Sequence, residues 1–362
     1  MGKTPSTRYS GARSAALALP GLGVVINNIH MMDEMAKEEI RISRSRQMLS
    51  IIAMFMIVQF SGLLLASLVF SGLTISQVSS ARIASSFNSV IFYLFYIVIL
   101  ALILIFVMKI YRGYKLFIVF EGIVIFIASF FVFLIVIGAL THSIQSTLFG
   151  GGVSVQVIVA GLLAFLLVIA KNKWQNLRNT AAIIASIGVG VVLGVSFGFF
   201  EALLFMALLA IYDFIAVFIT KHMITIANAA VNRNLALFVG ASEIEAVPES
   251  EFPRSQIARF EEMKKRAKKK LPVLKALKGR KLVPIEVPAM LGTGDLAVPL
   301  MVSISAYSAT LSFTLSIFVA VGAVFGLIIT MFILQKLNRA LPAIPPLLLG
   351  VLIFVGLYLL IY

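Results

Sequence analysis

The chain has 362 residues, of which 60% are hydrophobic and 12% are charged. This composition excludes an ordinary soluble protein and predicts an integral membrane protein with several spans. The absence of cysteine excludes disulfides and Cys-ligated metal sites, and the three histidines form no H-E-x-x-H pair for a catalytic zinc. The net charge of +15 lies in segments that flank apolar runs, without an aromatic stacking platform, so we expect no nucleic acid partner.

The first 47 residues contain no spanning run, and we interpret them as a basic cytoplasmic extension. Residues 15–29 weakly resemble a signal peptide, but Pro20 and Gly21 interrupt that stretch. Runs close to the length of about 20 apolar residues that a membrane helix needs follow. There are nine, at 48–75, 87–110, 116–140, 153–170, 181–200, 202–220, 287–306, 311–334 and 341–361. Only Glu201 separates the fifth and sixth runs, and only residues 307–310 separate the seventh and eighth.

The distribution of Lys and Arg predicts the orientation of these runs, since basic residues accumulate in cytoplasmic loops. With a cytoplasmic N-terminus, Arg82 is the one basic residue of 30 that falls outside. We therefore expect an all-α polytopic membrane protein with nine transmembrane helices, its N-terminus in the cytoplasm and its C-terminus outside. The predicted organisation is an extension at 1–47, helices one to six at 48–220, a basic loop at 221–286 and helices seven to nine at 287–362.

The long loop is densest in Lys and Arg at residues 254–281, where apolar side chains are interleaved. One interpretation is a surface helix held to anionic lipid, with roughly 1 kcal/mol for each basic residue near the membrane. The other is a solvated loop whose charge only fixes the topology. Both remain open from the sequence.

Four acidic residues lie in or beside the predicted spans. Glu121 and Glu201 fall near span ends, where we expect them to reach interfacial water. Asp213 and Asp295 lie deeper, about 12–14 Å from the cytoplasmic ends of the sixth and seventh spans at a rise of about 1.5 Å per residue. Because these spans run in opposite directions, the two aspartates are predicted to lie at the same depth.

Paired carboxylates in a low dielectric cannot both ionise easily, so they share a proton. Such a pair can hydrolyse a peptide bond: one carboxylate takes a proton from water, and the other protonates the carbonyl oxygen and then the leaving nitrogen. This chemistry needs no metal or other cofactor. The same pair would also suit a cation or proton channel or transporter, which is the alternative function.

Two further segments accompany the aspartates. Gly292, Thr293 and Gly294 precede Asp295, and glycines in a membrane helix permit close backbone approach or local unwinding. At the start of the last span, prolines in residues 340–346 predict that the segment enters the membrane extended, although proline also commonly marks a helix start.

Together these motifs resemble the presenilin and signal peptide peptidase family of intramembrane aspartyl proteases. Tyr212-Asp213 is similar to its Tyr-Asp motif, and Gly292-Thr293-Gly294-Asp295 is similar to its G-x-G-D motif. Pro342-Ala343-Ile344, which follows Leu341, is similar to its Pro-Ala-Leu motif, with Ile in the third position. The resemblance covers the chain from about the first span to its C-terminus. It implies Asp213 and Asp295 as catalytic residues, with the other motif residues supporting the site or binding substrate.

The predicted orientation is that of presenilins, which implies single-span membrane protein substrates with their N-termini outside. The length of the chain and the absence of the loop features of eukaryotic relatives imply a microbial, archaeal member in the plasma membrane of a prokaryote. We expect a homo-oligomer. Leu282-Val283-Pro284-Ile285, just before the seventh span, is prone to form a strand. We hypothesise that Leu282, Val283 and Ile285 belong to a strand that pairs with an unwound substrate segment.

Motifs of two other protease classes also occur in the sequence. Residues 194–198 spell G-x-S-x-G around Ser196, with His142 as the available base, but the motif lies inside a predicted helix instead of a strand-to-helix turn. The spacing of Gly190, Gly194 and Gly198 favours tight helix packing. A prepilin peptidase also uses a G-x-G-D aspartate, but the proline segment and Tyr212-Asp213 argue against it.

Overall fold

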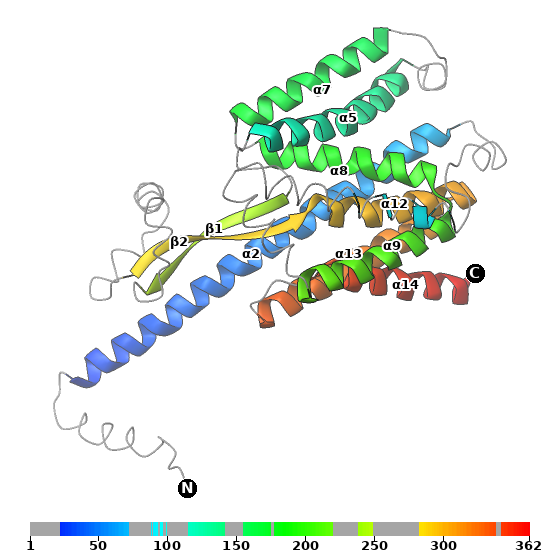
Figure 1. The fold of residues 1–362 in the computed structure, drawn as a ribbon. Helices are drawn as coiled ribbons and strands as arrows, with labels where there is room; N and C mark the ends of the chain where they lie inside the picture. Colours follow the sequence, from blue (N-terminus) through cyan, green and yellow to red (C-terminus); the bar gives the residue numbers. More distant parts are fainter. Residues whose placement is uncertain are drawn as a thin grey trace. The chain divides into compact units, whose positions relative to one another are not determined.

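The computed structural model describes residues 22–71, 88, 90–92, 95, 96, 99, 115–141, 155–174, 177–219, 238–248, 282–337 and 342–362. These residues form α2 (Leu22–Phe70), α5 (Lys115–Leu140), α7 (Val155–Lys173), α8 (Leu177–Ser196), α9 (Phe199–Phe214), the π-helix η2 (Ile215–Ile219), β1 (Phe238–Pro248), β2 (Leu282–Gly292), α12 (Thr293–Thr310), α13 (Phe313–Leu337) and α14 (Ile344–Ile361) (Figure 1). The chain divides into two units, one of residues 1–49 and 242–288 and the other of residues 50–241 and 289–362.

The predicted helical membrane fold is confirmed. Within the described residues, seven helices are long and apolar enough to cross a bilayer, namely the end of α2, α5, α7, α8, α9 with most of η2, α13 and α14. The second predicted span, 87–110, lies largely outside the described residues. The count of nine spans and the orientation of the termini stay predictions.

Helix α12 lies at the centre of the larger unit. It contacts α8, α9, α13 and α14, and every residue from Leu296 to Ser308 is buried (Figure 1). It is not among the seven helices that are apolar enough to span a membrane alone. Its neighbours cover it, so its sequence can carry serines where a lipid-facing helix needs hydrocarbon.

The first predicted span, which starts at residue 48, agrees with the apolar segment Ser45–Phe70. Helix α2 itself begins earlier, at Leu22, because the polar residues that exclude 22–47 from the bilayer do not prevent a helix there. Other predicted boundaries are wrong. The seventh span was predicted from residue 287, but β2 continues to Gly292 and α12 starts at Thr293. Prolines at 284 and 288 cannot donate helical hydrogen bonds and favour the extended backbone.

The two short breaks between predicted spans also lie at other residues than expected. Helix α8 ends at Ser196 and α9 starts at Phe199, so the break precedes Glu201, which lies in the first turn of α9. Helix α12 runs through residues 307–310 and stops at Leu311, which adopts a left-handed conformation with φ of 49°. Polarity alone therefore placed the breaks a few residues from where the backbone turns.

The glycines of α8 pack against α12, as their spacing predicted. A Cβ built on Gly190 would lie 2.7 Å from the Leu300 side chain, and one built on Gly194 would lie 2.6 Å from that of Ile304. Ser196 donates its hydroxyl to the Val192 carbonyl of its own helix at 2.7 Å. The packing interpretation is confirmed for Gly190 and Gly194, whereas Gly198 lies beyond the end of α8 and His142 lies outside the described residues.

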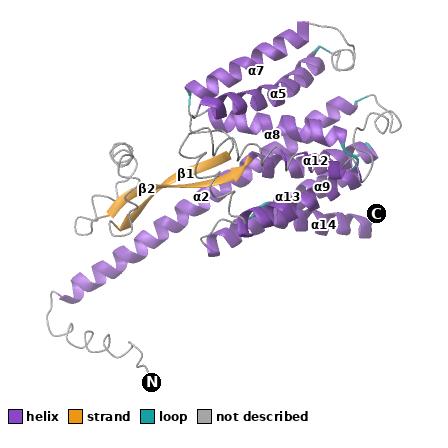
Figure 2. Cartoon of the chain, viewed as in Figure 1, coloured by secondary structure: helices purple, strands orange, loops and turns teal. Residues whose placement is uncertain are grey.

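Strands β1 and β2 form a two-stranded sheet (Figure 2). The strand expected at residues 282–285 is thus confirmed as part of a longer one, but β1 was not predicted within the 221–286 loop. Apolar and polar residues alternate only in the middle of β1, around Ile244, so the strand has no clear periodic pattern in the sequence. The basic 254–281 segment lies outside the described residues.

Helices α5 and α7 are joined by an ion pair. Lys171 Nζ lies 2.8 Å from Glu121 Oε2, and each side chain is only 3% exposed. The expectation that Glu121 reaches interfacial water is therefore wrong. A cation one helix away neutralises the carboxylate, which lets it stay buried.

Candidate active site

The two aspartates lie at the ends of helices that contact each other. Asp213 is the last residue but one of α9, and Asp295 is in the first turn of α12. Helices α9, α12 and α14 are in mutual contact. The carboxylates of Asp213 and Asp295 are close enough for their charges to interact.

Asp213 is buried, at 4% exposure, and is held by the start of α14. Its Oδ2 accepts a hydrogen bond from the Ile344 backbone N–H at 3.3 Å. The first helical N–H groups lack partners within their own helix, and two of those in α14 are absent because residues 345 and 346 are prolines. The remaining donor at the first helical position therefore points to Asp213, where the helix dipole also favours a negative charge.

This contact corrects the expected conformation of the proline segment. Pro342 and Ala343 are not helical, but α14 begins at Ile344, so residues 344–346 do not enter extended. Proline is accepted at a helix start because its fixed φ suits the helix and its missing donor is not needed there. Pro342, Ala343 and Ile344 are buried as part of this helix start, and Leu341 lies outside the described residues.

Asp295 is partly exposed, and its Oδ2 accepts a hydrogen bond from the Gly292 N–H at 3.2 Å. A Cβ on Gly292 would lie 3.1 Å from the same oxygen, so glycine leaves this carboxylate room. Gly294 is exposed, and a Cβ there would meet no atom of the described residues within 4 Å. The backbone beside Asp295 is thus open on the Gly294 side.

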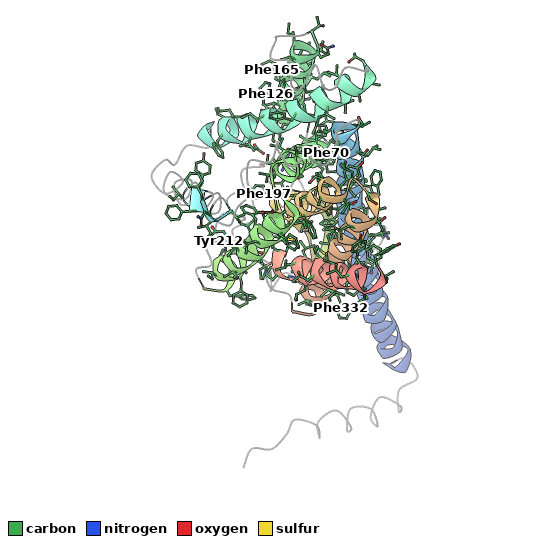
Figure 3. The ribbon with its side chains drawn as sticks, turned by 90° about the vertical axis from the view of Figure 1, so that its right-hand side faces the viewer. Phe70, Phe126, Phe165, Phe197, Tyr212 and Phe332 are labelled. Carbon is green, nitrogen blue, oxygen red and sulfur yellow. The ribbon has the colours of Figure 1, made fainter. Side chains whose placement is uncertain are left out.

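Of the other predicted residues, Tyr212 and Thr293 lie within two residues of the aspartates in the chain, whereas Leu282, Val283 and Ile285 lie toward the other end of β2, seven or more residues before Gly292. Tyr212, labelled on α9 in Figure 3, is partly buried beside Asp213. The Thr293 carbonyl lies 3.3 Å from Ser186 Oγ of α8, which also lies 2.8 Å from the Ala182 carbonyl and shares its one proton between them. Leu282, Val283 and Ile285 are on β2, which continues directly into Gly292.

Sequence reasoning missed two features of the site. Ser186 contacts the G-x-G-D backbone, and its only signal was a hydroxyl in an apolar run. The π-helix η2 starts two residues after Asp213, and such turns are frequent at functional sites, but no sequence pattern announces it. Among the described residues no group of three His, Cys, Asp or Glu side chains could hold a metal ion.

Comparisons with known proteins identify a family and a fold. The profile of a family described as signal-peptide peptidase, presenilin aspartyl protease matches residues 52–359. Two solved structures, described as a presenilin family intramembrane aspartate protease in space groups C222 and P2, are each 19% identical to the chain, with TM-scores of 0.52 and 0.53. The first covers 86% of this chain and 99% of its own, and the second covers 87% and 98%. No curated protein matches.

Proposed function

The chain belongs to the signal-peptide peptidase and presenilin family of aspartyl proteases, and from that premise we propose that Asp213 and Asp295 together hydrolyse peptide bonds within the membrane. The observation that carries the proposal is the mutual contact of α9, α12 and α14, with the two interacting carboxylates at the end of α9 and the start of α12 and with Asp213 bonded to the start of α14. Family membership makes membrane proteins or peptides the substrates, and it favours proteolysis over the transporter that the paired acids alone would allow.

The chemistry follows from two carboxylates that share one proton. The ionised member takes a proton from a water molecule, whose oxygen attacks the peptide carbonyl carbon. The protonated member donates its proton to the carbonyl oxygen and forms a tetrahedral intermediate. As the C–N bond breaks, one carboxyl group gives its proton to the nitrogen and the other carboxylate takes a proton from a hydroxyl of the intermediate. The products are a carboxylic acid and an amine, and the pair again holds one proton.

The surroundings support different tasks for the two aspartates. Asp213 is 4% exposed and bonded to Ile344, so its carboxylate is fixed by the start of α14. Asp295 is partly exposed beside Gly294, where a substrate backbone would meet no side chain of that residue. We propose that Asp213, held by its surroundings, fixes the orientation of the carboxylate pair. The substrate would approach Asp295 from its open side.

Strand β2 is the proposed docking element for the substrate. It pairs with β1 in a two-stranded sheet of the described residues and leads straight into the G-x-G-D segment. A peptide bond can be cut only when its helix is unwound, and an unwound segment has main-chain groups that need partners in the bilayer. Backbone hydrogen bonds with β2 would supply them next to Asp295.

The remaining partners follow from orientation and charge. With its N-terminus in the cytoplasm, the enzyme would cleave single-span proteins whose N-termini lie outside. We place it in the plasma membrane of a prokaryote, an archaeon, as a homo-oligomer. Anionic lipid would bind the basic 254–281 segment at roughly 1 kcal/mol for each residue near the surface.

The test is cleavage of a single-span substrate by the purified full-length protein in lipid vesicles. Asp213→Asn and Asp295→Asn keep side-chain size but remove the ability to exchange a proton. We expect each to abolish cleavage while leaving the thermal unfolding temperature close to that of the wild type. Cleavage by either folded variant would refute the two-aspartate mechanism, and Ser196→Ala would then be the next protein to assay.

A further inference from the structure

Helix α12 contains a proline one turn after Asp295. Pro299 has no N–H group, so the main-chain carbonyl of Asp295, four residues earlier, loses its usual helical donor. The proline ring also crowds that carbonyl, which is the usual cause of a kink. The turn that carries Asp295 is therefore joined to the rest of α12 by an incomplete set of helical hydrogen bonds.

One side chain from another helix reaches both sides of this break. Gln59 of α2 is fully buried, at 0% exposure. Its Nε2 donates to the Leu296 carbonyl at 3.4 Å, and its Oε1 accepts from the Ser303 hydroxyl at 3.3 Å. Leu296 precedes Pro299 and Ser303 follows it, so the amide bridges the position where the helix lacks a bond of its own.

The contacts of Gln59 are set by a close crossing of two helices. A Cβ on Gly62, nearly one turn further along α2, would lie 3.0 Å from Leu300 Cγ. Ser303 shares its single proton between Gln59 and the Pro299 carbonyl, which is 3.1 Å away. A buried primary amide is costly unless it is hydrogen-bonded, so the packed helices hold Gln59 to these partners.

We propose that Gln59 is a positioning residue that braces α12 across Pro299 and so fixes the turn that carries Asp295. Gln59 touches neither aspartate and acts through the backbone of α12. The proposal rests on the two-aspartate function, because only a carboxylate that must meet its partner and the substrate needs such fixing. A misplacement of about 1 Å at a catalytic group costs on the order of 100-fold in rate.

A double-mutant cycle separates positioning from packing. Pro299→Ala restores the N–H that can bond to the Asp295 carbonyl, which removes the need for a brace. In lipid vesicles we expect Gln59→Leu to lower kcat by about 10- to 100-fold while KM changes less than about threefold. Pro299→Ala should stay within about threefold of the wild type, and the double variant should match Pro299→Ala. Independent effects that multiply in the double variant would overturn the proposal.

Two further measurements keep the result decisive. If Gln59→Leu does not fold, Ser303→Ala replaces it in the cycle, alone and combined with Pro299→Ala. The proposal is overturned if Ser303→Ala lowers kcat and the combined variant shows the same loss. Ser129→Ala is the matched control, since Ser129 is equally buried but donates to its own helix on α5 at Ile125. Cleavage by Asp295→Asn would refute the two-aspartate function itself. If Asp295→Asn is inactive but the effects of Gln59→Leu and Pro299→Ala are not coupled, only the positioning role of Gln59 is refuted.

Discussion

Gly326 of α13 offers a way to move the start of α14 without touching either aspartate. A Cβ on Gly326 would lie 2.5 Å from the Pro346 carbonyl oxygen and 2.7 Å from Leu347 Cα. Ordinary contact between such atoms is about 3.5 Å, so Gly326→Ala must separate the two helices here by about 1 Å. The atoms in the way belong to the backbone, so no side-chain rotation can relieve the clash.

This displacement should reach the active site through Ile344. Its N–H donates to Asp213 at 3.3 Å, and about 1 Å of added distance takes the pair beyond hydrogen-bonding range. We expect kcat to fall by about 100-fold. The free energy of unfolding should fall by about 1–3 kcal/mol, as in other overpacked cores.

The assay is single-turnover cleavage of a single-span substrate in lipid vesicles, alongside thermal unfolding. Gly356→Ala on α14 is the control, because a Cβ there would meet no atom within 4 Å. It should cleave like the wild type. Wild-type cleavage by folded Gly326→Ala, or an equal loss in Gly356→Ala, would refute the idea that the α13 contact positions Asp213.

Three other variants test separate parts of the structure. Gly294→Ala should leave the unfolding temperature unchanged or raise it, since alanine favours a helix over glycine by about 1 kcal/mol. If the substrate backbone passes Asp295 at this residue, the added methyl group should lower kcat/KM at least tenfold. An unchanged kcat/KM would contradict that path. Lys171→Met should lower the free energy of unfolding by about 1.5–3 kcal/mol, because it removes the buried cation bonded to Glu121 and leaves Arg178 as the other nearby positive charge. Adding Glu121→Leu should recover part of that loss in denaturant titrations; a double variant no more stable than Lys171→Met would show that the Glu121 carboxylate is not the cause of the loss. Ile285→Pro should reduce cleavage without unfolding the protein, because proline removes a donor from β2, and full activity of the folded variant would exclude strand pairing through that residue.

Much of the fold was predictable because bilayer crossing imposes a length and a composition on each helix. The runs at 116–140, 153–170 and 311–334 match α5, α7 and α13 closely for this reason. Predictions failed where polarity and backbone geometry diverge. Residues 287–292 are apolar yet extended, because prolines precede and interrupt them.

The site was predictable to the extent that it consists of charges in an apolar setting. Asp213 and Asp295 stood out because an acid deep in a span needs a reason to be there. The partners that hold them are backbone groups, such as the N–H of Ile344, and every residue but proline has one. Glu121 was misjudged because its neutralising partner, Lys171, is fifty residues away in the chain and was counted among the loop charges.

The composition of α12 also bears on how the protein is made. A helix enters a bilayer from the synthesis machinery by its own apolar character, which the buried serines of α12 and the aspartate in its first turn reduce. Helix α12 falls short of the apolar character that its neighbour α13 has, and only residues 311 and 312 separate the two. We expect the pair to insert as one helical hairpin, with α13 drawing its partner in. The catalytic helix would then be among the last parts of the chain to find its place, and the enzyme would be inactive until the bundle is complete.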